Sequence, residues 1–305
     1  MAFVSSLSAA VLLAVISAGS SAVEFKPVDD LLSKQDKLTY RDCVLTRSVL
    51  PADKEHDLGQ LVSVLKCKGK EIRSIRSDLT EFNKDTAALW NRFGLVPLLG
   101  GADDKQIIMM EYSGGAHCCW GYWVYALGPE PIEIYSTEKW GLGDPMGYAD
   151  MDRDGVLEIS QEVMTFDYFD RCSHATSSLP LVVFKYDKNR REYLPANEAF
   201  AGELLNNTDA LIAALKRPAT EKDDEGGAFL GAVLGIVLPY VYAGREKDGW
   251  RIFERIYGLP DQAEMEAKIK AALADDAVYR YLNRGLSNNP GKAAVRKKDT
   301  ESRTK

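Results

Sequence analysis

Short segments rich in Ile, Val, Met, Tyr and Trp follow one another between residues 106 and 187, separated by Gly, Pro, Asp and Asn. β-branched and aromatic residues favour strands, and turn residues at this spacing suit antiparallel meanders. The expected strands are residues 107–113, 121–128, 131–137, 156–164 and 179–187. Residues 181–195 have the pattern of a hairpin that turns at Asp187–Arg190.

The hydrophobic period becomes helical after about residue 197. Amphipathic helices are expected at 210–217, 249–257 and 263–282, and an earlier short helix around 86–93. Residues 228–243 are uncharged and mostly apolar, yet the run is short for a membrane span and contains Pro239. We therefore expect a buried helix there, with a membrane anchor as the alternative.

These patterns predict an α+β protein. The β-rich domain, a blade- or sandwich-like antiparallel meander, is expected over residues 24–200, and a small α-helical domain over 201–283. The composition, 46% hydrophobic and 27% charged, excludes a disordered chain. The formal net charge of -7 gives no sign of a nucleic-acid partner.

The amino terminus resembles a secretory signal peptide over residues 1–22. Residues 9–16 form an apolar core of suitable length, and Ser20 and Ala22 are small residues before a cut at Val23. An uncleaved anchor is the alternative. We expect a periplasmic or secreted protein, and we expect residues 284–305 to form a disordered basic tail.

Export favours oxidation of the cysteines, which are Cys43, Cys67, Cys118, Cys119 and Cys172. Cys43 and Cys67 flank a strand–turn–strand pattern, so we predict that they pair. Adjacent residues on a strand point to opposite faces, so one of Cys118 and Cys119 could reach Cys172. Spacing alone leaves the connectivity open, and the odd count leaves one thiol over.

The most specific motif is the acidic loop at residues 150–159, which has the sequence DMDRDGVLEI. Its side chains alternate so that carboxylates can converge on one cation, and Gly155 permits a tight turn. The expected ligands are the side chains of Asp150, Asp152, Asp154 and Glu158 and the carbonyl oxygen of Val156. All-oxygen ligation favours calcium. The alternative is an Asp-rich hairpin turn with no metal.

The loop lacks the glutamate that closes an EF-hand, because Gln161 stands at position 12. It resembles instead the calcium loops of FG-GAP, integrin-type repeats, which lie between two strands. Glu158 replaces the aspartate usual in those loops. A single copy is present, so the resemblance implies one calcium loop and no full propeller.

A second unusual segment is Ser113–Trp120, with the sequence SGGAHCCW. His117 with Cys118 or Cys119 could form a thiolate and base pair for nucleophilic catalysis. The same residues with Cys172 and His174 could hold zinc or copper. Because export favours oxidation, we prefer disulfide chemistry here, with His117 ordering the loop.

Together, the SGGAHCC segment, the acidic loop and the expected aromatic strand TFDYFD, at residues 165–170, resemble a family of uncharacterised exported bacterial proteins. The resemblance covers residues 106–198. It implies a small β domain in which the two motifs lie near each other, and it implies no known activity.

No hydrolase, zinc-protease or nucleotide-binding motif is present, and no catalytic residues are predicted. We expect an exported, calcium-stabilised, non-enzymatic binding or scaffold protein whose partner is an unidentified protein or small ligand. An extracytoplasmic hydrolase or redox enzyme that uses His117 with Cys118 or Cys119 is one alternative. A membrane-associated protein anchored by residues 228–243 is another, although we expect no membrane contact.

Overall fold

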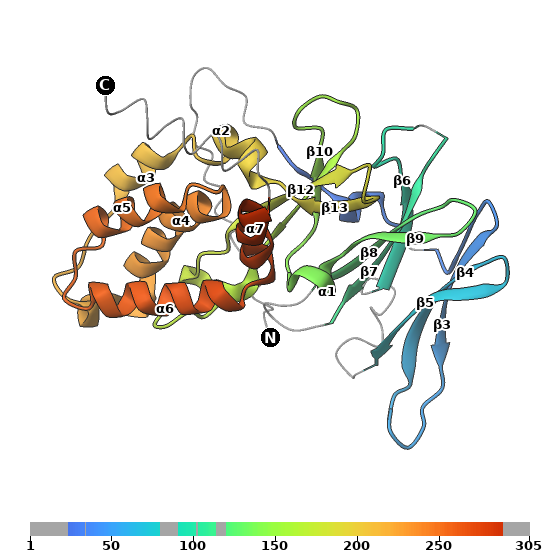
Figure 1. Cartoon of the computed structure of the whole chain (residues 1–305). Helices are drawn as coiled ribbons and strands as arrows, with labels where there is room; N and C mark the ends of the chain where they lie inside the picture. The colour runs from blue at the N-terminus through green and yellow to red at the C-terminus, as the bar shows by residue number, and fades with distance from the viewer. Residues whose placement is uncertain (1–23, 34, 80–90, 102, 114–119, 289–305) are drawn as a thin grey trace, which may run out of the picture.

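The computed structural model describes residues 24–33, 35–79, 91–101, 103–113 and 120–288, with side chains as far as Asn283. Three antiparallel sheets lie toward one end of the molecule, and most of the helices lie toward the other, whereas the short α1 (Thr137–Trp140) lies beside the sheets (Figure 1). This arrangement confirms the predicted α+β class, with a helical C-terminal region. The predicted signal peptide lies outside the described residues.

The sheets are built from strands that are mostly neighbours in sequence. The first sheet contains β2 (Lys37–Tyr40), β3 (Cys43–Leu50), β4 (Gln60–Cys67) and β5 (Lys70–Asp78). The second contains β6 (Asn91–Val96), β7 (Gln106–Tyr112), β8 (Trp120–Ala126) and β9 (Ile132–Ser136). The third contains, in spatial order, β1 (Lys26–Pro27), β10 (Gly147–Ala149), β11 (Glu158–Glu162), β12 (Leu181–Asp187) and β13 (Glu192–Pro195).

The helices connect and cover these sheets. The α-helices are α1 (Thr137–Trp140), α2 (Ala201–Leu204), α3 (Thr208–Ala214), α4 (Ala228–Tyr242), α5 (Glu246–Ile256), α6 (Gln262–Asp275) and α7 (Ala277–Asn288). The 3-10 helices are η1 (Val28–Leu31), η3 (Met164–Phe166), η4 (His174–Thr176), η5 (Asn197–Phe200), η6 (Glu221–Asp223) and η7 (Glu225–Gly227). α7 continues to Asn288 and so includes the first five residues of the expected tail, 284–288; residues 289–305 lie outside the description.

The middle sheet is buried on both faces, which explains the unbroken apolar run in β7. Ile107 and Met109 point into a core shared with the first sheet. Ile108 and Met110 point into a larger core shared with the third sheet and the helices. Because strand side chains alternate between faces, both sets must be apolar. The larger core is continuous across the expected domain boundary near residue 200.

Three local expectations are wrong. The single helix expected at 263–282 is divided into α6 and α7 at Asp276, which has an extended backbone conformation. Asn91–Phe93 belongs to β6 and not to a helix, because the fully buried Phe93 pairs with Met109 of β7 and fills the smaller core; residues 86–90 lie outside the description. The aromatic segment 165–170 forms a 3-10 helix and turns rather than a strand. Tyr168 and Asp170 adopt left-handed backbone angles, φ 52° and 51°, which interrupt an extended chain.

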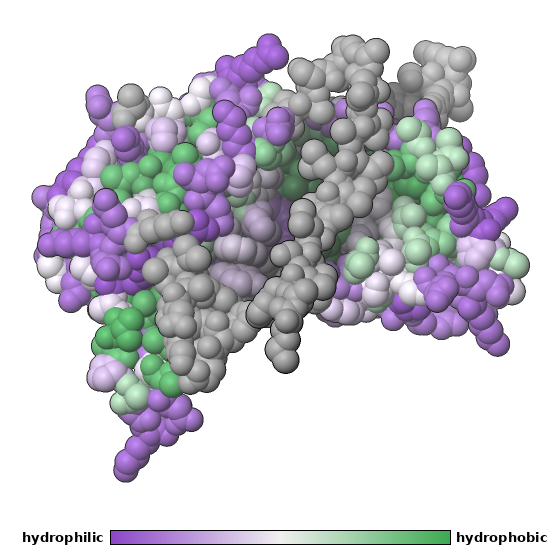
Figure 2. Space-filling model, turned by 180° about the vertical axis from the view of Figure 1, so that it is seen from behind, coloured by the Kyte–Doolittle hydropathy of each residue, from purple (hydrophilic) through white to green (hydrophobic). Residues whose placement is uncertain are grey.

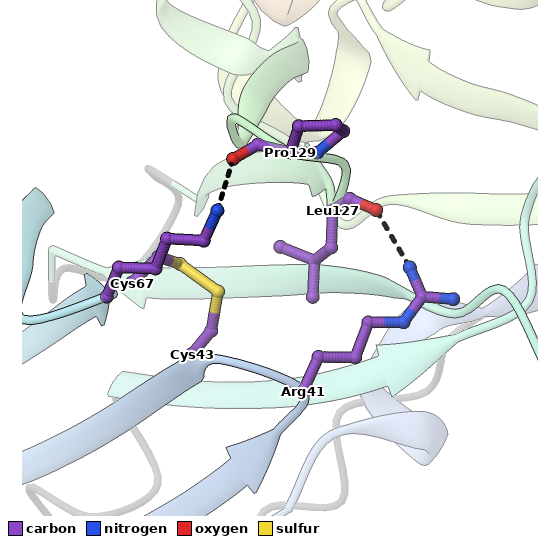
Figure 3. The surroundings of a disulfide bond; sticks show 6 residues. Arg41, Cys43, Cys67, Leu127 and Pro129 are labelled. Carbon is purple, nitrogen blue, oxygen red and sulfur yellow. Dashed lines mark hydrogen bonds between the residues drawn. A yellow bond between two sulfur atoms is a disulfide. The ribbon is translucent and has the colours of Figure 1, made fainter.

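The predicted Cys43–Cys67 disulfide is present, and it joins two residues that face each other across β3 and β4 (Figure 3). It lies beside the turn between β8 and β9. Two backbone carbonyls near this turn accept hydrogen bonds from the first sheet: Leu127 from Arg41 Nη1 at 2.8 Å and Pro129 from Lys68 Nζ at 2.9 Å. The disulfide therefore stabilises one end of the first sheet, the end at which Arg41 and Lys68 contact the middle sheet.

The apolar run 228–243 forms α4, and most of its side chains lie in the larger core. Among the described residues, the segment Glu225–Tyr242 is long and apolar enough to cross a membrane, yet 67% of it is buried inside the protein. On the described part of the face in Figure 2, hydrophobic residues form separate patches with polar residues between them. These features favour the interpretation of α4 as a core helix.

Gly231 allows α4 to pack directly on a backbone segment. A methyl group at this position would lie 1.7 Å from the carbonyl oxygen of Thr176 in η4. At Gly235, one turn later, the nearest atom would be Ser178 Oγ at an ordinary 3.7 Å. Close packing of the helix on η4 therefore requires glycine at position 231 and not at 235.

We predict that Gly231→Ala destabilises the protein by about 2 kcal/mol or more, because the helix must move away from η4. Gly235→Ala is the matched control and should leave stability unchanged or raise it by up to about 1 kcal/mol, the helix-propensity gain. Thermal melts followed by circular dichroism would measure both variants. Equal melting temperatures for the two variants would contradict the close-packing argument.

Candidate functional site

The acidic loop connects β10 to β11, as the sequence predicts for a loop between two strands. Its own side chains hold its shape: Asp150 Oδ2 accepts a hydrogen bond from Gly155 N at 3.2 Å, and Asp154 Oδ1 accepts one from Val156 N at 2.8 Å. Gly155 has φ 82°, a conformation that favours glycine. The loop packs on Gly100, where a methyl group would lie 2.3 Å from the Gly155 carbonyl oxygen.

Three carboxylates of this loop converge. One oxygen from each of Asp150, Asp152 and Glu158 lies within 4.8 Å of the others. Glu158 is fully buried, and its Oε2 accepts a hydrogen bond from Met151 N at 2.7 Å. Its Oε1 and the buried Oδ1 of Asp150 accept no hydrogen bond. Buried carboxylate oxygens without donors are costly, and a hard cation would satisfy them.

The electrostatics of the loop agree with this geometry. Burial raises the pKa of Glu158, and the nearby charges of Asp152 and Asp154 add to the effect. Asp154 behaves differently, because the hydrogen bond from Val156 N and its contact with Lys185 lower its pKa. Asp154, one of the predicted ligands, lies outside the close group of three carboxylates.

Lys185 is the site residue that sequence reasoning missed. Its ammonium group donates a hydrogen bond to Asp152, lies 3.1 Å from Asp154 Oδ2 and lies 3.8 Å from Glu158 Oε1. The register that pairs Ile159 with Phe184 also puts Lys185 opposite Glu158 on the neighbouring strand. A lysine within a run of strand residues carries no signal of this contact, because the strand pairing is known only from the fold.

Of the residues in the SGGAHCC hypotheses, Cys172 and His174 lie in the described part of the chain. His117, Cys118 and Cys119 lie outside the described residues, so neither a disulfide nor a metal set involving them can be placed. The Cys172 thiol is buried and donates to the Gly227 carbonyl at 3.4 Å, and burial raises its pKa to about 11. His174 Nδ1 lies 2.9 Å from Asp167 Oδ1.

A second acid with a shifted pKa lies on β11, at the half-buried Glu162. Burial, together with the adjacent carboxyl group of Asp144, raises the pKa of Glu162 well above that of an ordinary glutamate. The glutamate therefore holds a proton in the folded protein at pH values where the unfolded chain has released it. No sequence pattern indicated this pair, because its two members approach each other only in the fold.

An apolar cavity of about 440 Å³ lies between α3 and α4. Its volume is within the range of small-molecule sites. The lining residues are Leu211, Ala214, Leu215, Lys216, Ala228, Phe229, Ala232, Gly235 and Ile236. Lys216 is the one charged residue among them, so the cavity combines apolar walls with a single positive charge.

We predict that stability falls as pH rises above about 4.5, the ordinary pKa of a glutamate, because the unfolded chain then binds fewer protons at position 162 than the folded protein. Glu162→Gln should remove this part of the pH dependence and stabilise the protein at pH 8 by at least about 1.4 kcal/mol. Urea unfolding of wild type and of Glu162→Gln at pH 5 to 8 would measure the pH dependence of stability. Glu203→Gln, a change at an exposed glutamate, is the control. Parallel pH profiles for wild type and Glu162→Gln would contradict the assignment.

Comparison with protein-family models, with curated proteins and with solved structures gives no match to this chain.

Proposed function

We propose that this chain is an exported, calcium-stabilised binding or scaffold protein that performs no chemistry of its own. The observation that carries the proposal is the convergence of Asp150, Asp152 and Glu158, with two buried carboxylate oxygens that accept no hydrogen bond. A divalent cation would neutralise this charge and stabilise the β10–β11 hairpin at the edge of the large core.

Calcium is the cation that this ligand chemistry favours. The three converging groups offer only carboxylate oxygens, whereas zinc and copper prefer nitrogen and sulfur ligands. The loop also has the spacing of the FG-GAP calcium loops that it resembles. Its exposed residues, among them Arg153 and Gly155, leave room for water ligands on the solvent side.

Export is supported by the Cys43–Cys67 disulfide, because disulfides persist in oxidising compartments. It agrees with the signal-peptide pattern of residues 1–22. Calcium is abundant outside cells, where sites with dissociation constants of about 10⁻⁴ to 10⁻³ M are common. A weak structural site would therefore be loaded after export.

We predict that millimolar calcium raises the melting temperature of the purified chain relative to excess chelator. If the dissociation constant is about 10⁻⁴ M, calcium at about 10 mM is about 100 times that value and adds about 2.7 kcal/mol, or about 5 °C or more for a protein of this size. Asp152→Asn should lose the shift, whereas Asp57→Asn, an exposed aspartate elsewhere in the chain, should retain it. Superimposable wild-type melts in calcium and in chelator would overturn the proposal.

The cavity between α3 and α4 supports a specific ligand class for the binding role. Its apolar walls and Lys216 suit a small apolar molecule that carries an anionic group. Dodecanoate is a suitable probe, measured by displacement of an anilinonaphthalene sulfonate dye. Ala232→Trp, which places an indole at the cavity, should abolish displaceable binding. Ala213→Trp, on the same pair of helices but outside the lining, should not. Equal binding by both variants would argue against this site.

A further inference from the structure

We infer that Lys185 is a tethered competitor of the cation, and that its ammonium group sets the calcium concentration at which the acidic loop is loaded. The inference rests on the proposed function and concerns the same site. It assigns to Lys185 a role that no motif indicates: the lysine occupies the carboxylate group at low calcium and leaves it when calcium binds.

The contacts of Lys185 overlap with those that a cation would need. Its ammonium group contacts Asp152 and lies 3.8 Å from Glu158 Oε1, and these are two of the three converging carboxylates. Calcium binds carboxylate oxygens at about 2.3 to 2.6 Å. An ion at that distance from both groups would lie in contact with the ammonium, and the two positive charges would repel each other. Lysine and calcium therefore exclude each other.

The carboxylates are held in place, whereas the lysine is free to move. Glu158 is fully buried and bonded to Met151 N, and Asp150 accepts from Gly155 N. The Lys185 side chain is 32% exposed, and its long stem allows the ammonium to turn into solvent. Departure of the lysine requires rotation of one side chain and no movement of β12.

Lys185 satisfies the site only in part. Its hydrogen bonds go to Asp152 and Asp154, while Glu158 Oε1 and Asp150 Oδ1 still accept none. The single charge of the Lys185 ammonium cannot balance the four carboxylates at positions 150, 152, 154 and 158. The lysine thus reduces repulsion enough for the loop to adopt its shape without metal, and it leaves two buried oxygens for a divalent ion. This balance makes calcium binding weak and reversible.

Calcium titration calorimetry on the full chain tests the inference. Lys185→Met removes the charge and keeps the apolar stem, Lys185→Arg retains a positive charge, and Lys188→Met removes a nearby charge that makes no hydrogen bond to the loop. If the lysine occupies the site in nine molecules of ten, its removal tightens the apparent dissociation constant about tenfold. We expect this for Lys185→Met, and values within about twofold of wild type for the other two.

The outcomes separate this inference from the proposed function. In one outcome wild type binds calcium, Asp152→Asn abolishes the binding, and Lys185→Met binds calcium no more tightly than wild type. This outcome would overturn the role of Lys185 but would leave the calcium site supported. Absence of calcium binding in wild type and in all Lys185 variants would overturn both.

A measurement on the wild-type chain covers the case in which Lys185→Met does not fold. Pulse acetylation of lysine amines, read by mass spectrometry, should show that calcium increases the modification of Lys185 severalfold and leaves Lys188 unchanged. Equal modification of Lys185 in calcium and in chelator, at calcium concentrations that raise the melting temperature, would overturn the inference.

Discussion

The buried carboxylate of Asp224 organises the junction between the sheets and the helices. It is 2% exposed, and it accepts hydrogen bonds from the first backbone amides of α4, at Phe229 and Leu230, 2.8 and 3.1 Å away. These amides have no partner within the helix, and a negative charge at a helix amino terminus is favourable. Arg171 donates to Asp224 at 3.0 Å and to the Tyr257 hydroxyl at 2.8 Å. The network therefore joins the segment after β11 to α4 and to the end of α5.

This junction determines where the remaining helices can lie. Apolar side chains cover most of the circumference of α4 and are buried in the core. This burial requires that Asp224 fixes the first turn of α4 and that Gly231 lets the helix pack closely on η4. Neutralising Asp224 would weaken the acceptor of the two α4 amides and remove one of the carboxylates paired with Arg171, whose guanidinium also contacts Asp170 and Asp261. The continuous core that results supports the third sheet, whose β10–β11 hairpin carries the acidic loop.

The acidic loop illustrates how a stable scaffold can hold an unstable arrangement of charge. Carboxylates that repel one another stay together because backbone amides, the Gly100–Gly155 contact and the buried position of Glu158 hold them. A cation, whether the ammonium of Lys185 or a metal ion, then lowers the energy of that arrangement. In the proposed exchange the two cations differ in charge and in how they are attached, and this difference would make the site responsive to the surrounding solution.

Local chemistry made the strands, the acidic loop and the Cys43–Cys67 pair predictable from the sequence, because alternation, turn residues and hairpin spacing act over short distances. Two of the wrong expectations lie at the end of the helix expected over 86–93 (Asn91–Phe93) and at the strand expected over 165–170. Long-range packing of Phe93 and left-handed turn residues outweighed local preference there. The position of Lys185 opposite Glu158, the Asp144–Glu162 pair and the cavity between α3 and α4 were decided only by the tertiary structure. Each depends on register or packing between segments distant in sequence, and no single segment encodes such relations.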